Sequence, residues 1–202
     1  MGAPRLQENS KFGEHFRSVF GKEAEAISHS SGQLSKLFKS LDPISGRKRG
    51  RPKQFNVLGV IERCLGLFSD IVAETSINVV TPRADEDISV VGYESDLMAA
   101  LINIIDNAVH WLSVSPEGSK VLELSISTSK KYVKIAISNS GIKIPESFYD
   151  RLFSPSFTLK TEGSGIGLAI AREAMRTSKG DVAFDPDSDQ TTFVIEMQRA
   201  PK

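Results

Sequence analysis

Two amides and an imidazole recur along one short stretch of the chain at spacings that suit one face of a helix. Asn103, Asn107 and His110 share a stripe if the backbone turns by about 100° per residue. An Asn carbonyl oxygen is a neutral, hard ligand for Mg²⁺, and such an ion would bring its own charge to a polyphosphate. The stripe therefore predicts one wall of a phosphate pocket. Amides that face solvent or pack against another helix remain the alternative from these residues alone.

A glycine-rich turn is the second candidate for phosphate chemistry. Residues 162–168 read E-G-S-G-I-G-L and precede a helical pattern. Glycines let backbone N–H groups face a ligand, and a helix N-terminus adds partial positive charge. Such a turn is weak support by itself, because glycine-rich turns before helices are common. Two further polar segments lie upstream of it, residues 139–145 and residues 151–160.

The amide stripe requires a helix over residues 95–112, for which Ser95 is a suitable N-cap. The face opposite the stripe is apolar and suits packing on a sheet: Leu97, Leu101, Ile104, Ile105, Ala108 and Leu112. Residues 121–129 and 132–139 alternate apolar and polar side chains, which predicts a β-hairpin. We expect further strands over residues 77–80, 88–91, 181–187 and 191–198, and helices over residues 55–75, 144–150 and 165–178.

Helices that alternate with mostly antiparallel strands predict an α+β fold, a two-layer α/β sandwich. The 202 residues suffice for one such domain with an appendage. The 25 basic and 25 acidic residues cancel, so no chain-wide charge favours nucleic acid or a membrane. The single cysteine, Cys64, excludes an intrachain disulfide. No leader and no apolar run of membrane-spanning length occurs, so we expect a cytoplasmic location with no membrane contact in this chain.

The N-terminal part differs in composition from the rest. Apolar residues in residues 1–41 recur at spacings of three, four and seven, which predicts an amphipathic helical segment that docks on the domain or dimerises. Residues 42–54 are rich in Pro, Gly and basic residues, which is typical of a linker. Within it, residues 49–53 read R-G-R-P-K and resemble the core of an AT-hook, a minor-groove DNA-binding element. A solvated basic linker explains the same residues.

Four motifs occur in the order found in the catalytic, ATP-binding domain of sensor histidine kinases. They are N-x-x-x-N-A, N-S-G-x-x-I-P, L-F-x-P-x-F-T-x-K and G-S-G-I-G-L-A-I. Residues 55–198 therefore resemble that family, whose ATPase superfamily includes type II topoisomerases, mismatch-repair proteins and a heat-shock chaperone. Four motifs in order are far more specific than any one. The resemblance implies a Bergerat-type fold over residues 55–202 that binds ATP and Mg²⁺.

The resemblance also implies roles for individual residues. Asn107 would ligate Mg²⁺, Asn103 would line the phosphates and His110 would contact a phosphate. Together with Lys160, these residues would form the catalytic set. Asn139 would accept a hydrogen bond from the adenine amino group. Phe157 would belong with Phe153 and Lys160 to a mobile lid. The other implied ATP contacts are Gly141, Ile144, Phe153, Gly163, Ser164, Gly165, Ile166, Gly167, Leu168 and Thr192.

Two positions depart from what relatives of this kind carry. Asn139 stands where an Asp is usual, and Lys143 replaces a glycine. Hydrolytic members of the superfamily have Glu where Asn103 stands, and an amide cannot act as the general base for water. The sequence therefore favours phosphoryl transfer to a protein acceptor over ATP hydrolysis.

The acceptor itself is not evident in this chain. His15 and His29 lack the acidic residue that usually follows an acceptor histidine in the family, so we expect both to be ordinary helix residues. The sequence predicts a protein-histidine kinase domain, inactive as this fragment, of a two-component system. Its expected partners are a second copy of the chain and a histidine-bearing domain or a response regulator, with DNA a weaker candidate. A catalytically silent or nucleotide-gated interaction module and a DNA-associated ATPase are the alternatives.

Overall fold

The computed structural model describes residues 50–82, 88–116, 118, 120–161 and 163–201. All of them lie in the second of two units into which the chain divides, Ser40–Lys202. The predicted helical segment over residues 1–41, with His15 and His29, lies outside the described residues, as does most of the predicted linker.

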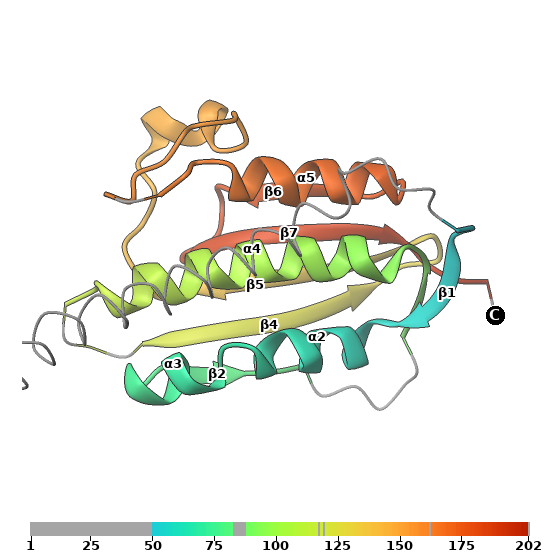
Figure 1. Ribbon diagram of the computed structural model, residues 1–202, viewed down its shortest axis with the longest axis horizontal. Coiled ribbons are helices and arrows are strands. Elements are labelled where there is room, and N and C mark those ends of the chain that lie inside the picture. Colours follow the sequence, from blue (N-terminus) through green and yellow to red (C-terminus); the bar gives the residue numbers. More distant parts are fainter. Residues whose placement is uncertain (1–49, 83–87, 117, 119, 162, 202) are drawn as a thin grey trace, which may run out of the picture. The chain divides into compact units, whose positions relative to one another are not determined.

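A five-stranded sheet forms one layer of the domain (Figure 1). Its first strand is parallel to the second and every other neighbour is antiparallel. The predicted hairpin is confirmed as β4 and β5. In spatial order the strands are β2 (Asn78–Val80), β4 (Val121–Thr128), β5 (Tyr132–Asn139), β7 (Thr191–Gln198) and β6 (Asp181–Asp185). A separate two-stranded sheet pairs β1 (Lys53–Asn56) with β3 (Ser89–Gly92).

The longer helices form the second layer on one face of the sheet (Figure 1). The central α4 packs against α5 on one side and α2 on the other. This arrangement confirms the predicted two-layer α+β sandwich. The helices are α2 (Val57–Gly66), α3 (Ser69–Glu74), α4 (Glu94–Ser113) and α5 (Gly167–Thr177), with a 3₁₀ turn, η1 (Glu146–Arg151), between β5 and α5.

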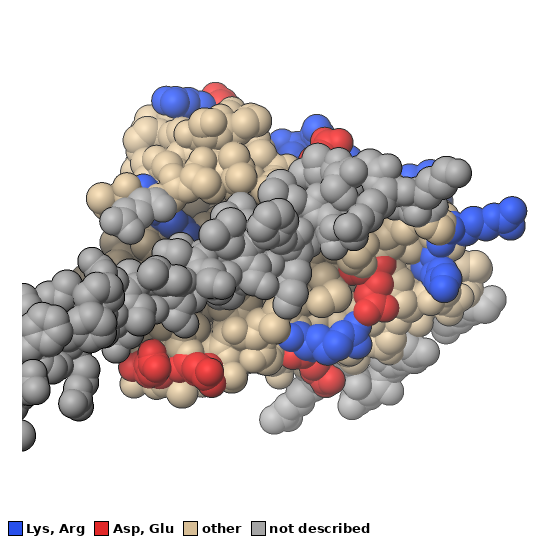
Figure 2. Space-filling view, viewed as in Figure 1, with Lys and Arg blue, Asp and Glu red and all other residues tan. Residues whose placement is uncertain are grey.

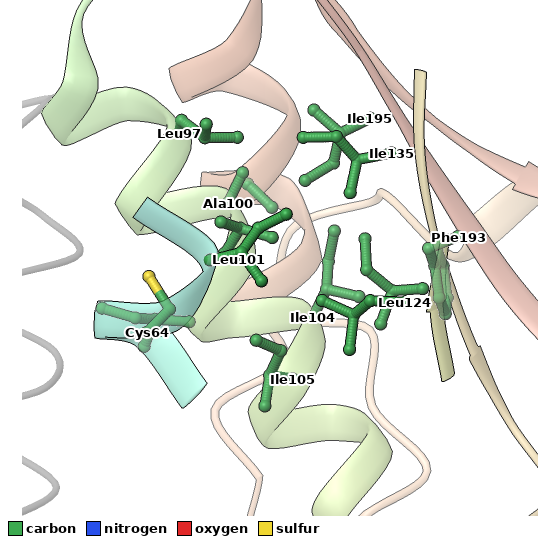
Figure 3. Packing of buried hydrophobic residues seen from close by; sticks show 14 of the residues in the cluster. Cys64, Leu97, Ala100, Leu101, Ile104, Ile105, Leu124, Ile135, Phe193 and Ile195 are labelled. Carbon is green, nitrogen blue, oxygen red and sulfur yellow. The ribbon is translucent and has the colours of Figure 1, made fainter. Parts of the chain in front are cut away.

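The core lies between α4 and the inner face of the sheet. Figure 3 shows the apolar side chains of α4 directed at side chains of β4, β5 and β7. The whole predicted apolar face of α4 is buried, with each of its six side chains at most 2% exposed. Cys64 of α2 packs into the same core, and burial raises the pKa of its thiol to about 12. The core therefore fixes the rotation of α4 about its axis, and with it the direction of the amide stripe.

Several predicted boundaries were wrong for local reasons. The helix expected over residues 55–75 is two helices, because Asn56 caps a helix that begins at Val57 and a turn follows Gly66. Lys53 and Gln54, assigned to the linker, belong to β1. Ser95 is not the N-cap of α4, since the helix already begins at Glu94.

A buried polar clasp joins the start of α4 to the end of α5. The Ser178 hydroxyl donates to Asp96 Oδ2 at 2.8 Å and accepts the Tyr93 backbone N–H at 3.0 Å. Asp96 is fully buried and Ser178 is 4% exposed. Because a buried carboxylate depends on its donors, this hydroxyl helps to hold α4 and α5 in register.

Replacing Ser178 by alanine should therefore destabilise the domain by about 1–3 kcal/mol, the cost of removing a donor from a buried polar group. Thr177→Ala is the matched control, since Thr177 is exposed and, among the residues that the structure describes, its hydroxyl bonds only to Glu173 O one turn earlier. That control should change stability by no more than about 0.5 kcal/mol. Urea unfolding of both variants measures the difference, and equal midpoints would contradict the role of the clasp.

Candidate functional site

The predicted polar stripe lies on the side of α4 that faces away from the sheet. Asn103, Asn107 and His110 are half-buried, whereas the apolar face opposite them is closed off in the core. The Asn103 Nδ2 donates to the backbone carbonyl of Ala99 at 2.8 Å, which leaves the Asn103 Oδ1 as an acceptor. The Asn107 side chain makes no hydrogen bond within the described residues. Two amide oxygens one turn apart are therefore available to a ligand.

A cation from the segment after β5 reaches this stripe. Lys160 Nζ lies 3.2 Å from Asp106 Oδ2, and the Lys160 side chain is only 17% exposed. Burial lowers the pKa of His110, and the nearby Lys160 ammonium lowers it further, partly offset by Asp106. His110 is therefore neutral at pH 7 and can donate one N–H to an anion without carrying a charge. An arriving anion would find one ammonium group and one imidazole beside the amide oxygens.

The glycine turn lies against the start of the stripe. A Cβ on Gly167 would come 2.9 Å from Asn103 Oδ1, so a side chain there would press on the amide. Gly165 has a φ of +68°, and a Cβ on it would lie 2.6 Å from the Ser156 carbonyl carbon. Gly165 requires glycine both for space and for its backbone conformation, whereas a side chain at position 167 would displace the Asn103 amide. Gly167 at the start of α5 thus lies beside Asn103, and Gly165 lies beside Ser156 of the preceding segment.

The turn after β5 is built around Asn139, which is 3% exposed. Its Oδ1 accepts the Gly141 N–H at 3.2 Å and its Nδ2 donates to the Thr191 carbonyl at 3.2 Å. A Cβ on Gly141 would lie 2.9 Å from the same Oδ1, which explains the glycine. The Asn139 oxygen has a second lone pair, so it can still accept a hydrogen bond from a ligand.

The structure places Thr192 away from this turn. Successive side chains of a strand point to opposite faces, and the register pairs Asn139 with Thr191 and Ser138 with Thr192. The Thr192 hydroxyl lies 2.8 Å from the Ser138 hydroxyl, on the other face of the sheet. The threonine beside Asn139 is Thr191, whose hydroxyl donates to the Ile142 carbonyl at 3.3 Å. The structure therefore places Thr191, and not the predicted Thr192, on the face of the sheet that carries Asn139.

Because the two threonines lie on opposite faces of the sheet, their substitutions should affect nucleotide binding differently. Thr191→Val should weaken nucleotide binding about threefold to tenfold, because the variant lacks one polar group, of about 1 kcal/mol, beside Asn139. Thr192→Val removes the same hydroxyl from the other face of the sheet and should leave the affinity unchanged. Titration of both variants with a fluorescent ATP analogue compares them. A weaker affinity in Thr192→Val than in Thr191→Val would place Thr192 at the nucleotide instead.

The segment between β5 and α5 stands at the end of the domain where α4 finishes and α5 starts (Figure 1). Two aromatic residues of this segment pack against different parts of the protein. Phe157 packs on Phe148 with ring centroids 5.5 Å apart, within the segment itself. Phe153 packs edge-on against Phe193 of β7, and the Arg172 guanidinium lies 4.6 Å from its ring centre. Phe153 is therefore attached to the core.

The remaining predicted site residues also differ in how they are attached to the domain. Ile144 and Leu168 are half-buried against the core, Ile166 is the N-cap of α5, and Ser164 is exposed. A Cβ on Gly163 would collide with Thr158.

Two residues of the candidate site were not predicted from the sequence. Asp106, the partner of Lys160, could have been found because it lies on the same helix face as Asn103 and His110. Thr191 could have been found from the alternation of Phe193, Ile195 and Met197, whose burial sets the phase of β7.

Metal binding here would not use a ready-made protein cage. Within the described ranges, no three His, Cys, Asp or Glu side chains gather as ligands. Neutral amide oxygens such as those of Asn103 and Asn107 suit an ion that arrives bound to a polyphosphate. Such an ion retains the phosphate oxygens as its other ligands. Among the described helices, none combines the length and apolar composition that a membrane crossing requires.

Curated relatives are sensor kinases much longer than this chain. The adaptive-response sensory kinase SasA of Rippkaea orientalis is 29% identical over 61% of this chain and 32% of its own length. The probable sensor kinase SilS of Salmonella typhimurium is 34% identical over 51% of this chain and 21% of its own length. AtoS of Escherichia coli, a signal transduction histidine-protein kinase, is 25% identical over 88% of this chain and 28% of its own length. The chain thus spans a third or less of these relatives.

Solved structures share the fold. The catalytic domain of the histidine kinase ThkA superposes with a TM-score of 0.65 at 24% identity, covering 75% of this chain and all of that domain. Full-length ShkA in complex with AMPPNP superposes with a TM-score of 0.71 at 18% identity, covering 92% of this chain and 39% of ShkA.

A family match agrees with the geometry of the amide stripe, the glycine turn and the turn at Asn139. The family described as "Histidine kinase-, DNA gyrase B-, and HSP90-like ATPase" matches residues 92–201, more than half of the chain. The matched residues run from the end of β3 through all the site elements. The chain therefore belongs to this family of histidine kinase-, DNA gyrase B- and HSP90-like ATPases.

Proposed function

We propose that this domain binds Mg²⁺–ATP and transfers the γ-phosphoryl group to a histidine of a protein partner. The observation that carries this proposal is the convergence of three elements on one face of α4. The amide of Asn107, the half-buried ammonium group of Lys160 and Gly167 of the glycine turn lie along it. A polyphosphate needs this combination of a metal ligand, a cation and exposed backbone N–H groups.

Each residue would have a distinct task. The Asn107 Oδ1 would hold Mg²⁺, with the Asn103 Oδ1 next to it, and the ion would neutralise charge on the phosphates when bound. Lys160 would exchange its Asp106 carboxylate for a phosphate oxygen, and His110 would donate an N–H to another. The predicted lid, residues 142–162, would close over the nucleotide and exclude water, with Phe153 as its fixed anchor. Asn139 would position the adenine from the opposite side of the site.

The residue types favour transfer over hydrolysis. No carboxylate occupies position 103, and the Asn103 amide cannot accept a proton from water. The catalytic contribution of the domain would then be positioning and electrostatic stabilisation of the phosphoryl group. The nucleophile must come from elsewhere, since His15 and His29 lack the sequence context of an acceptor.

The partner would be a histidine-bearing helical hairpin or a response regulator. The histidine kinase ThkA has been solved in complex with the response regulator protein TrrA, and that structure superposes with a TM-score of 0.64 at 19% identity, covering 96% of this chain and 62% of ThkA. In the same proposal, residues 1–41 dock or dimerise, residues 42–54 connect, residues 55–202 form the catalytic domain, and the protein acts in the cytoplasm.

One observation favours a second candidate, a nucleotide-gated module without transfer activity. The Asn139 Oδ1 already accepts the Gly141 N–H and lacks the charge of a carboxylate. A neutral acceptor binds an amino group more weakly, by about 1 kcal/mol. Such a domain would still change shape with nucleotide but would turn over slowly.

The deciding experiment is a titration of the full chain with a fluorescent ATP analogue, with and without Mg²⁺. The proposal expects saturable binding that strengthens at least about tenfold with the metal, as expected for a contact to a charged group. Binding that ignores Mg²⁺ would rule out the metal role of Asn107. No binding at all would remove both candidates.

A further inference from the structure

Basic side chains surround a hollow at the end of the domain opposite Asn139. Lys130 and Lys131 come from the β4–β5 turn, Lys179 follows α5 and Arg199 follows β7. The hollow has a volume of about 580 Å³, and exposed Tyr132 forms part of its rim. Four cations from three separate parts of the chain thus meet around one concave surface.

The acidic residues that the structure describes at this end pair with other cations. Glu94 pairs with Arg63, and Glu196 pairs with Lys134 at 3.4 Å. Asp181 lies 3.0 Å from Arg172 Nε and 3.5 Å from Arg176 Nε. None of these cations lines the hollow.

By contrast, Lys130, Lys131 and Lys179 have no acidic partner within the described residues. Arg199 donates to the Ser129 carbonyl, and no carboxylate of the described part of the chain pairs with it. The hollow is therefore a local concentration of positive charge on a chain with no net charge.

The basic linker enters the domain at this same end. Lys53 is paired with Gly92, and a Cβ on Gly92 would lie 3.2 Å from Ser178 Cβ, next to Lys179. Arg51 and Lys53 are exposed. Figure 2 shows Lys and Arg side chains projecting from the end where Figure 1 places β1. In the sequence, Arg51 belongs to the R-G-R-P-K segment that the proposed kinase function does not use.

The hollow is separate from the nucleotide site. Tyr132 and Asn139 begin and end β5, and eight residues of strand span roughly 25 Å. A ligand at the basic end would therefore leave Asn103, Asn107 and Lys160 accessible.

We propose that this basic end, comprising Arg51, Lys53, Lys130, Lys131, Lys179 and Arg199, binds double-stranded DNA through its phosphates. Uncompensated cations on neighbouring turns suit a phosphate backbone, which carries regularly spaced charges. The Gly-Arg-Pro sequence at residues 50–52 suits an arginine placed in a minor groove. An anionic membrane is the less suitable partner, because the cations surround a hollow and Tyr132 is the only exposed large apolar side chain among its described lining residues.

The test measures fluorescence anisotropy of a labelled A·T-rich duplex with the full chain, over a series of salt concentrations. Affinity should fall as salt rises. At about 0.1 M salt, the DNA affinity of the variant Lys130→Gln/Lys131→Gln should be lower than that of the parent chain. The decrease should be about eightfold for each phosphate that the variant no longer neutralises. The plot of log affinity against log salt should become less steep by about 0.9 for each such phosphate. The matched control is Arg63→Gln/Lys134→Gln, which removes the same charge from two cations that pair with Glu94 and Glu196 and do not line the hollow.

The controls separate this proposal from the kinase proposal. Both double variants should bind the ATP analogue as the parent chain does, which shows that each is folded. Equal decreases of DNA affinity in the two double variants would overturn the proposal, as would the absence of DNA binding at low salt. It would also be overturned if the Lys130 and Lys131 substitutions abolished binding to phosphatidylserine-rich vesicles while DNA binding was unchanged.

Discussion

Replacement of Asn107 by alanine is expected to weaken Mg²⁺-dependent ATP binding about tenfold to a hundredfold, which corresponds to roughly 1.5–3 kcal/mol for a contact to a charged group. The side chain makes no hydrogen bond within the described structure, so its only substantial task would be to meet the ion. Truncation should for the same reason change the stability of the domain by less than about 0.5 kcal/mol. Binding without Mg²⁺ should be nearly unaffected.

Isothermal titration with ATP, in the presence and absence of Mg²⁺, measures both effects on one preparation. The matched control is Asn78→Ala, because Asn78 is an exposed asparagine on β2, in the edge strand of the sheet. An affinity and a melting temperature that both equal those of the parent chain would exclude Asn107 as the metal ligand. A lowered melting temperature with equally weakened binding in both buffers would assign it a structural task.

The layers of the fold could be predicted because their patterns are local. The apolar face of α4 repeats with the helical period, and β4 and β5 alternate with the strand period, so each element shows its buried face directly. The break between α2 and α3 could not be read this way. Apolar residues recur all along residues 55–75, and only the turn after Gly66 separates the two helices.

The sequence could predict only those parts of the site whose relative positions follow from a single element. The spacing of Asn103 and Asn107 follows from one helix and needs no knowledge of other elements. Thr191 and Thr192 are chemically identical neighbours, so the choice between them depends on the register of β7 against β5. The pairing of Lys160 with Asp106 likewise joins residues 54 apart in the chain and follows from how the segment before α5 folds back.

Incubation of this chain alone with γ-labelled ATP is expected to leave the protein unlabelled and to release phosphate only slowly. Transfer requires an in-line nucleophile, and neither His15 nor His29 has the sequence context of an acceptor. Hydrolysis requires a base for water, and the Asn103 amide cannot serve. The domain alone is therefore expected to bind ATP but to transfer or hydrolyse its γ-phosphate only slowly.

A helical hairpin that carries an acceptor histidine should restore transfer when it is fused to the N-terminus or added in trans. Fusion should give the faster reaction, because a tethered acceptor has a high effective concentration at the phosphoryl group. The label should be lost in acid and survive base, as a phosphohistidine does. Asn103→Glu provides an internal comparison: it supplies a carboxylate beside the phosphates and should raise phosphate release rather than histidine labelling. Acid-labile label on His15 or His29 of the unmodified chain would show that the acceptor is intrinsic, and rapid phosphate release without label would place the domain among the hydrolytic members of its family.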